Sequence, residues 1–181
     1  KSTMEIAELL MKATDFAAKA HRKQLRKDGE TPYINHPIGV ANILASVGKI
    51  SDPNILISAL LHDTVEDTAV TFDEIEKNFG SKVRSIVEEL TIDKTLPKHE
   101  RKQLEIENAS KCCDEAKLIK MADKLHNLED LLERNPIGWS EQRVQNYFEW
   151  SAKIIENLLN MNVEIENRCR MILSQRNVSL S

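Results

Sequence analysis

Residues 55–68 read ILISALLHDTVEDT: an apolar helix that ends abruptly in one imidazole and three carboxylates. The run Ile55–Leu61 is apolar nearly all round, and such a helix is buried on most of its sides. Carboxylates gathered at the end of a buried helix repel one another and are costly to remove from water. They need a compensating cation, so this segment predicts a metal site. The alternative is a helix C-terminus capped by His62 and followed by an acidic loop.

The helical pattern continues outward from this segment to both ends of the chain. No sustained alternation of the kind that strands show is present, and glycines and prolines fall mostly at boundaries. Ser2 with Glu5 and Thr71 with Glu74 are capping boxes that mark helix starts, and Asp114 can cap a long helix. A charged and exposed helix is expected to end near Asn108. The sequence predicts an all-α, single-domain bundle of about eight to ten helices over residues 1–181.

The composition is typical of a globular protein and excludes several classes. The 181 residues are 41% hydrophobic and 30% charged, enough for one full core. No apolar run approaches a membrane span, and no signal-peptide layout opens the sequence. Cys112, Cys113 and one further cysteine form neither a disulfide framework nor a zinc knuckle, which indicates a cytoplasmic location. A net charge of −4 argues against nonspecific nucleic-acid binding, and no feature of the sequence sets an oligomeric state.

One short stretch is nevertheless strongly basic. Residues 21–27 read HRKQLRK, with four fixed positive charges. On an otherwise acidic protein such a stretch could attract a small polyanion.

Two further segments strengthen the metal hypothesis. His36 lies between a turn and a helix that has Pro37 in its first turn, so its backbone is well defined. Asp123 lies at the edge of the apolar stripe of a long helix. Taken alone, His36 could be a cap or a packed core residue, and Asp123 could be a solvated charge beside Lys120 and Lys124.

Together with the pair His62-Asp63, these two residues form a mixed nitrogen and oxygen ligand set with open positions. Such a set suits a divalent ion such as manganese, and iron, zinc and magnesium remain open on chemistry alone. Glu66 and Asp67, just beyond the ligands, are placed to orient or deprotonate a water molecule.

Three longer strings resemble the hydrolase domain of the RelA/SpoT family. They are His21-x-x-Gln24-x-Arg26-Lys27-x-Gly29-x-x-Pro32-Tyr33-x-x-His36-Pro37, His62-Asp63-Thr64-Val65-Glu66-Asp67-Thr68 and Ala122-Asp123-Lys124-Leu125-His126-Asn127. Their order and approximate spacing match that family, and His62-Asp63 is the doublet that gives HD phosphohydrolases their name. The segments Trp139-Ser140-Glu141 and Tyr147-Phe148-Glu149-Trp150 resemble the stand-alone metazoan SpoT homologues.

This resemblance implies a hydrolase with one Mn²⁺ ion per chain that removes pyrophosphate from the 3′ position of ppGpp or pppGpp, leaving GDP or GTP. By motif position, the metal ligands would be His36, His62, Asp63 and Asp123. Glu66 and Asp67 would be the catalytic pair. The residues expected to contact the nucleotide are Arg26, stacked on the guanine, with Lys27, Tyr33, Asn127 and Tyr147.

Some features of the sequence leave alternatives open. Tyr33 could equally be a core aromatic residue, and Tyr147 lies on the apolar face of a helix. Glu129 stands where many bacterial relatives have a basic residue, which puts phosphate contacts at that position in doubt. With no room for a synthetase half, the chain is expected only to degrade its nucleotide.

Two alternative functions remain. One is a metal-dependent phosphatase of another 2′- or 3′-phosphorylated nucleotide such as NADPH. The other is a helical interaction module with a vestigial site, against which the intact Glu66-Asp67 pair argues.

Overall fold

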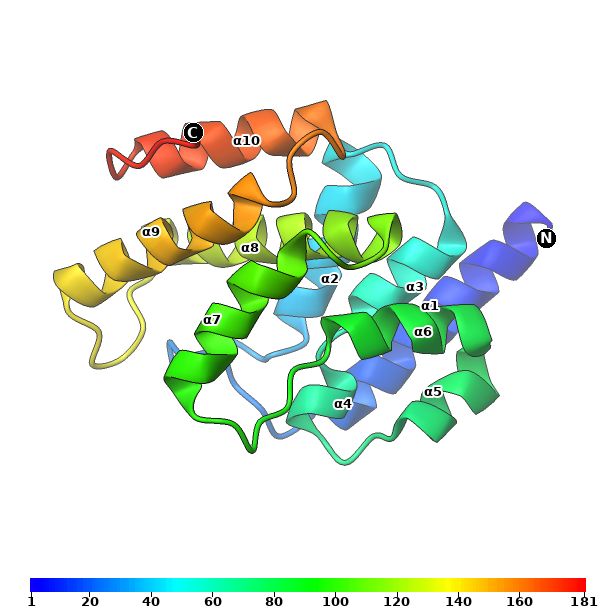
Figure 1. Ribbon diagram of the computed structural model, residues 1–181. Helices are drawn as coiled ribbons and strands as arrows, with labels where there is room; N and C mark the ends of the chain where they lie inside the picture. Colours follow the sequence, from blue (N-terminus) through cyan, green and yellow to red (C-terminus); the bar gives the residue numbers. More distant parts are fainter.

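The computed structural model describes residues 1–181 and consists of ten α-helices, one of which runs on into a π-helical turn (Figure 1). The all-α fold class and the predicted number of helices are confirmed. None of the helices has the length and apolar character needed to cross a membrane. The elements are α1 (Thr3–Ala20), α2 (Asn35–Asn42), the π turn η1 (Ile43–Val47), α3 (Pro53–Leu61), α4 (Thr64–Asp67), α5 (Phe72–Phe79), α6 (Ser81–Leu90), α7 (Lys98–Ala109), α8 (Asp114–Glu133), α9 (Glu141–Glu156) and α10 (Val163–Ser174).

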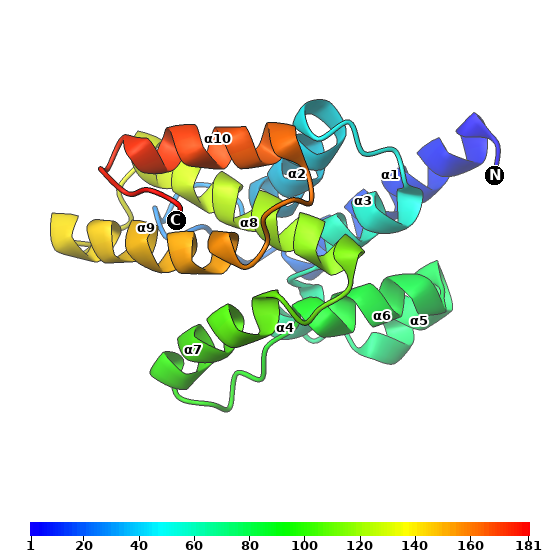
Figure 2. The same ribbon diagram turned by 45° about the horizontal axis from the view of Figure 1, so that its top comes forward.

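Helix α3 lies between two hydrophobic clusters, which explains why it is apolar on all sides. Every residue from Ile55 to Leu61 is buried. One face joins the larger cluster around α8, and the other joins a smaller cluster with α1, α5 and α6. Figure 2 shows α8, α9 and α10 lying side by side, with α4 to α7 on the opposite side of the molecule. The cleft described below lies where these two parts face each other.

Both capping boxes predicted from the sequence are present. The hydroxyl of Ser2 accepts from the backbone N–H of Glu5, whose carboxylate accepts from the backbone N–H of Ser2. Thr71 and Glu74 make the same reciprocal pair at the start of α5. Asp114 was predicted to cap α8, and this is wrong by one residue: the N-cap position belongs to Cys113, and no side chain caps this end.

Helix α2 begins earlier than its proline suggests. It starts at Asn35, so His36 lies inside its first turn and Pro37 is its third residue. The first four N–H groups of a helix have no partner within it, so a proline costs nothing there. The result is that His36 projects from regular helix rather than from the preceding loop.

Helix α3 ends at Leu61 and is followed by a break and a new short helix. The hydroxyl of Thr64 donates to the carbonyl of Leu61, so that carbonyl has a side-chain partner where α3 ends. Asp63 has φ −100° and ψ −2° and is the N-cap of α4. This bend places His62 and Asp63 at the end of one helix, with Glu66 and Asp67 in the next.

Candidate functional site

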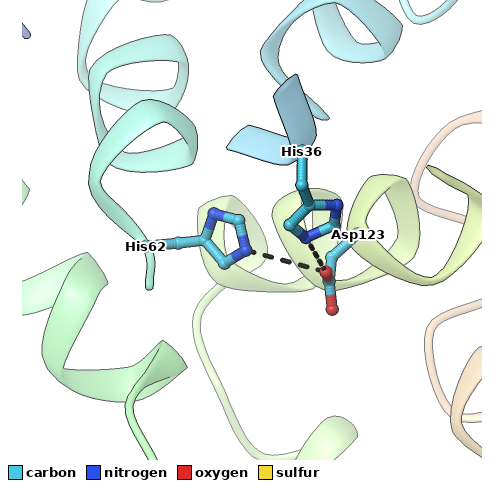
Figure 3. A group of neighbouring side chains, drawn as sticks. All are labelled: His36, His62 and Asp123. Carbon is cyan, nitrogen blue, oxygen red and sulfur yellow. Dashed lines mark hydrogen bonds and ion pairs between the residues drawn. The ribbon is translucent and has the colours of Figure 1, made fainter. Parts of the chain in front are cut away.

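His36, His62 and Asp123 converge from three helical segments that are far apart in the sequence. Figure 3 shows both imidazole rings directed toward one oxygen of Asp123. Asp123 Oδ1 lies 2.8 Å from His36 Nε2 and 3.6 Å from His62 Nε2. The three potential ligand atoms all lie within 4.8 Å of one another. The side chains of His36 and His62 are only 1% and 5% exposed, so this is a buried cluster.

Asp63 completes the group of four predicted metal ligands. Its Oδ2 atom lies 3.1 Å from His62 Nε2 and 3.7 Å from His36 Nε2. The Tyr33 hydroxyl donates to the same oxygen over 2.6 Å. Burial, and then the Asp63 carboxylate, raise the pKa of Tyr33 well above its usual range, so this hydroxyl stays protonated. Tyr33 is therefore more than a core aromatic residue, because its hydroxyl holds a carboxylate of the cluster.

The donor set fits a divalent cation. His62 Nδ1 lies 2.6 Å from the carbonyl of Ala59, an acceptor, so Nδ1 carries a ring hydrogen. His62 Nε2 is buried and has no hydrogen-bond partner, although Asp63 Oδ2 lies 3.1 Å away. Burial by itself would lower the pKa of His62, but the carboxylates of Asp63 and Asp123 raise it well above its usual value, so the metal-free ring holds a second proton that a cation would replace. The orphaned Nε2 atom is thus the feature that points to a metal.

Asp123 is held in its ionised form. Burial by itself would raise the pKa of this carboxyl, but Lys124, together with the two histidines, lowers it well below the usual value. Lys124 Nζ lies 3.3 Å from Asp123 Oδ2 and 3.0 Å from Glu105 Oε2. Lys124 is buried, so Asp123 is not the solvated surface charge that its lysine neighbours in the sequence suggested.

Glu66 and Asp67 lie beside this cluster and are held by the segment that precedes α7. Glu66 Oε1 accepts from the backbone N–H of Ile92 over 2.8 Å. Burial raises the pKa of Glu66 to about 7, and Asp63 and Asp67 add to the shift. Asp67 pairs with Lys94 and accepts from the Gln24 side chain over 3.3 Å. One carboxyl is thus able to exchange a proton near neutral pH, and its neighbour is fixed by two partners.

A single cavity of about 1320 Å³ contains the whole site. This volume exceeds the range of about 300–1,000 Å³ that is usual for small-molecule sites. The residues on its wall include all those predicted from the sequence: Arg26, Lys27, Tyr33, His36, His62, Asp63, Glu66, Asp67, Asp123, Asn127 and Tyr147. The predicted residues, which lie up to 121 positions apart in the sequence (Arg26 to Tyr147), thus line the same cavity.

Arg26 is fixed by two side chains of α8. Its Nη2 atom donates to Asn127 Oδ1 and to Asp130 Oδ2, both over 2.8 Å, and Nε donates to Asp130 Oδ2 over 3.2 Å. Its guanidinium lies over the Tyr33 ring, 5.6 Å from the centroid. Asp130 was missed by the sequence reasoning, although its position three residues after Asn127 places it on the same helix face.

The wall of the cavity also carries an aromatic row with interleaved cations. The Tyr147 ring lies 5.9 Å from that of Trp139 and 5.3 Å from that of Trp150. Lys27 and Arg143 lie over Trp139. Tyr147 is thus part of the cavity wall as well as of a helix face.

The expectation that the charged helix before Asn108 is simply exposed is wrong for one face of α7. Lys98, Arg101, Lys102 and Glu105 line the cavity. Their spacing of three, four and seven residues places them on one stripe, a signal that was available in the sequence. Glu129, by contrast, pairs with Arg168 over 3.1 Å and does not line the cavity, so its departure from the family pattern does not affect the site.

An all-α fold in which a His-Asp doublet, a second histidine and a distant aspartate converge beside a carboxylate pair defines an HD-type hydrolase. Residues 13–147 match the family model described as the HD domain. The chain is 56% identical to a Xenopus tropicalis protein over 163 residues, covering 90% of this chain and 91% of that one. It is 54% identical to a Homo sapiens protein over 175 residues, covering 96% and 98%. Both relatives are named guanosine-3′,5′-bis(diphosphate) 3′-pyrophosphohydrolase MESH1.

A solved structure is similar over nearly the full length, with a TM-score of 0.91, 46% identity and coverage of 98% of this chain and 97% of the other. It is described as a metazoan orthologue of SpoT that hydrolyses ppGpp and plays a role in starvation responses. The chain belongs to the MESH1 family of HD-domain hydrolases, the metazoan relatives of SpoT. The resemblance drawn from the three sequence strings is confirmed.

Proposed function

We propose that residues 1–181 act as one Mn²⁺-dependent hydrolase domain that converts ppGpp or pppGpp to GDP or GTP and pyrophosphate. One observation supports this proposal most directly. A single cavity is lined by the four candidate metal ligands, by the Glu66-Asp67 pair and by several lysines and arginines. Cations distributed along a cavity match a substrate with several phosphates. The names of the two MESH1 relatives support the choice of a guanosine bis-diphosphate.

One divalent ion per chain would be held by His36, His62, Asp63 and Asp123. When bound, it would act as a Lewis acid toward a phosphoryl oxygen and make a nearby water easier to deprotonate. The Nε2 atom of His62, which has no hydrogen-bond partner, and the ionised carboxylate of Asp123 support this assignment of the ion. Manganese accepts such a mixed set of imidazole and carboxylate ligands.

Glu66 and Asp67 have different roles in the proposed reaction. Glu66, whose pKa burial raises to about 7, takes a proton from water near neutral pH. Asp67 stays in place through Lys94 and Gln24 and orients the same water. The water oxygen bonds to the phosphorus attached to O3′, the bond from that phosphorus to O3′ breaks, and O3′ receives a proton. The products are pyrophosphate and a free 3′-hydroxyl.

A parallel assay tests this function. The purified chain is stripped of metal with a chelator and supplied in turn with Mn²⁺, Mg²⁺, Zn²⁺ or Fe²⁺, with ppGpp and NADPH as separate substrates. We expect Mn²⁺ to support release of pyrophosphate from ppGpp. The aromatic row of Trp139, Tyr147 and Trp150 offers a second ring-binding surface, which favours NADPH as the second candidate. Phosphate release from NADPH alone would support that candidate, whereas no turnover and no bound metal would contradict both and favour an interaction module.

Arg26→Ala is expected to raise KM for ppGpp about 10- to 100-fold with little change in kcat. The guanidinium is already oriented by Asn127 and Asp130, so its loss removes a contact to the base and leaves the metal cluster intact. Stacking of a flat side chain on a base contributes about 1–3 kcal/mol. Steady-state kinetics measure both constants.

Arg22→Ala is the matched control, because Arg22 belongs to the same basic stretch but is exposed and does not line the cavity. An unchanged KM in Arg26→Ala, or an equal rise in Arg22→Ala, would remove Arg26 from the base site.

A further inference from the structure

His126 contacts His36, one of the candidate metal ligands, but it is not itself one of those ligands. Its Nδ1 atom lies 2.8 Å from His36 Nδ1, and the two ring centroids are 4.9 Å apart. His126 lies on α8 three residues after Asp123, so side chains of the same helix contact both ring nitrogens of His36. Asp123 faces Nε2, and His126 faces Nδ1.

Only one hydrogen can lie between the two Nδ1 atoms, and this constrains both rings. A metal bound at His36 Nε2 requires a lone pair there, so the hydrogen of the neutral ring must be on Nδ1. His126 Nδ1 must then accept it, and His126 must carry its own hydrogen on Nε2. The 2.8 Å separation fits this arrangement without any movement of either ring.

Gly39 holds the His126 ring from the other side. A Cβ atom at this position would lie 2.2 Å from His126 Nε2 and 2.4 Å from its Cδ2, far inside contact distance. Gly39 lies within α2 and its φ is not positive, so the backbone itself does not require glycine. Glycine within a helix is about 0.5–1 kcal/mol less stable than alanine. Room for the His126 ring is the feature of the structure that accounts for this glycine.

We propose that His126 is a positioning residue, seated against Gly39, that keeps His36 in the tautomer able to bind the metal. The proposal rests on the proposed metal function of His36. It predicts that metal affinity depends on an acceptor atom at the position of His126 Nδ1 and on the absence of a side chain at residue 39.

The first test compares two substitutions of nearly equal shape. His126→Asn places an amide oxygen where Nδ1 stood, whereas His126→Leu places a methyl group there. Calorimetric titration of the metal-free chains with Mn²⁺ is expected to show a 10- to 100-fold loss of affinity for His126→Leu, the usual range for a hydrogen-bond partner of a metal ligand. His126→Asn is expected to stay within a few-fold of the wild type. Equal affinities for His126→Leu and the wild type, or equal losses in both variants, would overturn the proposal.

The second test changes Gly39, the residue of α2 that lies against the His126 ring. Gly39→Ala is expected to weaken Mn²⁺ binding about as much as His126→Leu, because the new methyl group displaces the ring. In a His126→Ala background the ring is gone, so adding Gly39→Ala should cause no further loss of affinity and no loss of thermal stability. Full Mn²⁺ affinity in the single Gly39→Ala variant would refute the role of this contact.

Titration of the wild-type chain with Mn²⁺ distinguishes a failure of the proposed function from a failure of the role proposed for His126. A wild-type chain that binds no Mn²⁺ overturns the proposed function and this inference with it. A wild-type chain that binds Mn²⁺, with every variant equal to it, overturns only the role of His126 and Gly39.

Discussion

Asp123→Ala is expected to release the divalent cation and to lower kcat/KM for ppGpp by at least about a thousandfold. Asp123 Oδ1 lies 2.8 Å from His36 Nε2 and 3.6 Å from His62 Nε2, so its removal takes away one of the two carboxylates that face both histidines. The change also leaves the buried ammonium of Lys124 with Glu105 as its remaining carboxylate partner. Metal content after dialysis, measured by elemental analysis, and steady-state kinetics test the two parts of this prediction.

Two further variants serve as controls for Asp123→Ala. Asp123→Asn keeps the shape of the side chain but removes its charge, so an intermediate metal affinity is expected. Glu129→Ala removes a carboxylate from the same helix that pairs with Arg168 outside the cavity, and should retain both metal and activity. Full metal content and rate in Asp123→Ala would mean that the cation is held elsewhere.

The convergence of the candidate metal ligands could be predicted in part because some of them interrupt a local pattern. His62 and Asp63 interrupt an apolar run, and His36 stands beside a proline that lies in the first turn of a helix. Asp123 lies at the edge of an apolar stripe. A polar group at such a place is costly unless it has a partner, so the sequence itself indicates that partners exist. The structure brings these four side chains together at one point.

The supporting contacts could not be predicted in the same way, because they depend on how two helices approach each other. The contact of His126 with His36 and the fit of Gly39 against the His126 ring require the actual distance between α2 and α8. Likewise, Glu66 is held by the backbone of Ile92, which any residue other than proline could supply. Periodicity assigns a residue to a face, but it does not set the distance to the next helix.

Helix boundaries differ from expectation for a related reason. A proline in a first turn marks a helix start only to within a few positions, so α2 could begin at Asn35, two residues before Pro37. The break between α3 and α4 depends on the Thr64 hydroxyl, which competes for a helical carbonyl. These small shifts matter because they decide the direction of His36 and His62.

Glu66→Gln is expected to lower kcat about 100- to 10,000-fold while the metal stays bound. Glutamine keeps the oxygen that accepts from the Ile92 N–H, so the loop remains attached, but it cannot take a proton from water. Metal content equal to the wild type, combined with the loss of rate, separates this effect from that of Asp123→Ala. Full activity in Glu66→Gln would refute its role as the base.

The same substitution is expected to stabilise the metal-free chain at alkaline pH. Burial raises the pKa of Glu66 from its ordinary value of 4.5 to about 7, so the folded state binds this proton more tightly than the unfolded state does. The wild type therefore loses stability as the pH rises from 4.5 to above 7, whereas the glutamine variant does not. The difference should be absent near pH 4 and reach about 1–3 kcal/mol near pH 8, measured by chemical unfolding with a chelator present. Glu8→Gln, a change on the exposed surface of α1, should show no such difference. If Glu66→Gln is no more stable than the wild type at pH 8, then the folded chain does not hold this carboxyl in a destabilised, base-competent state.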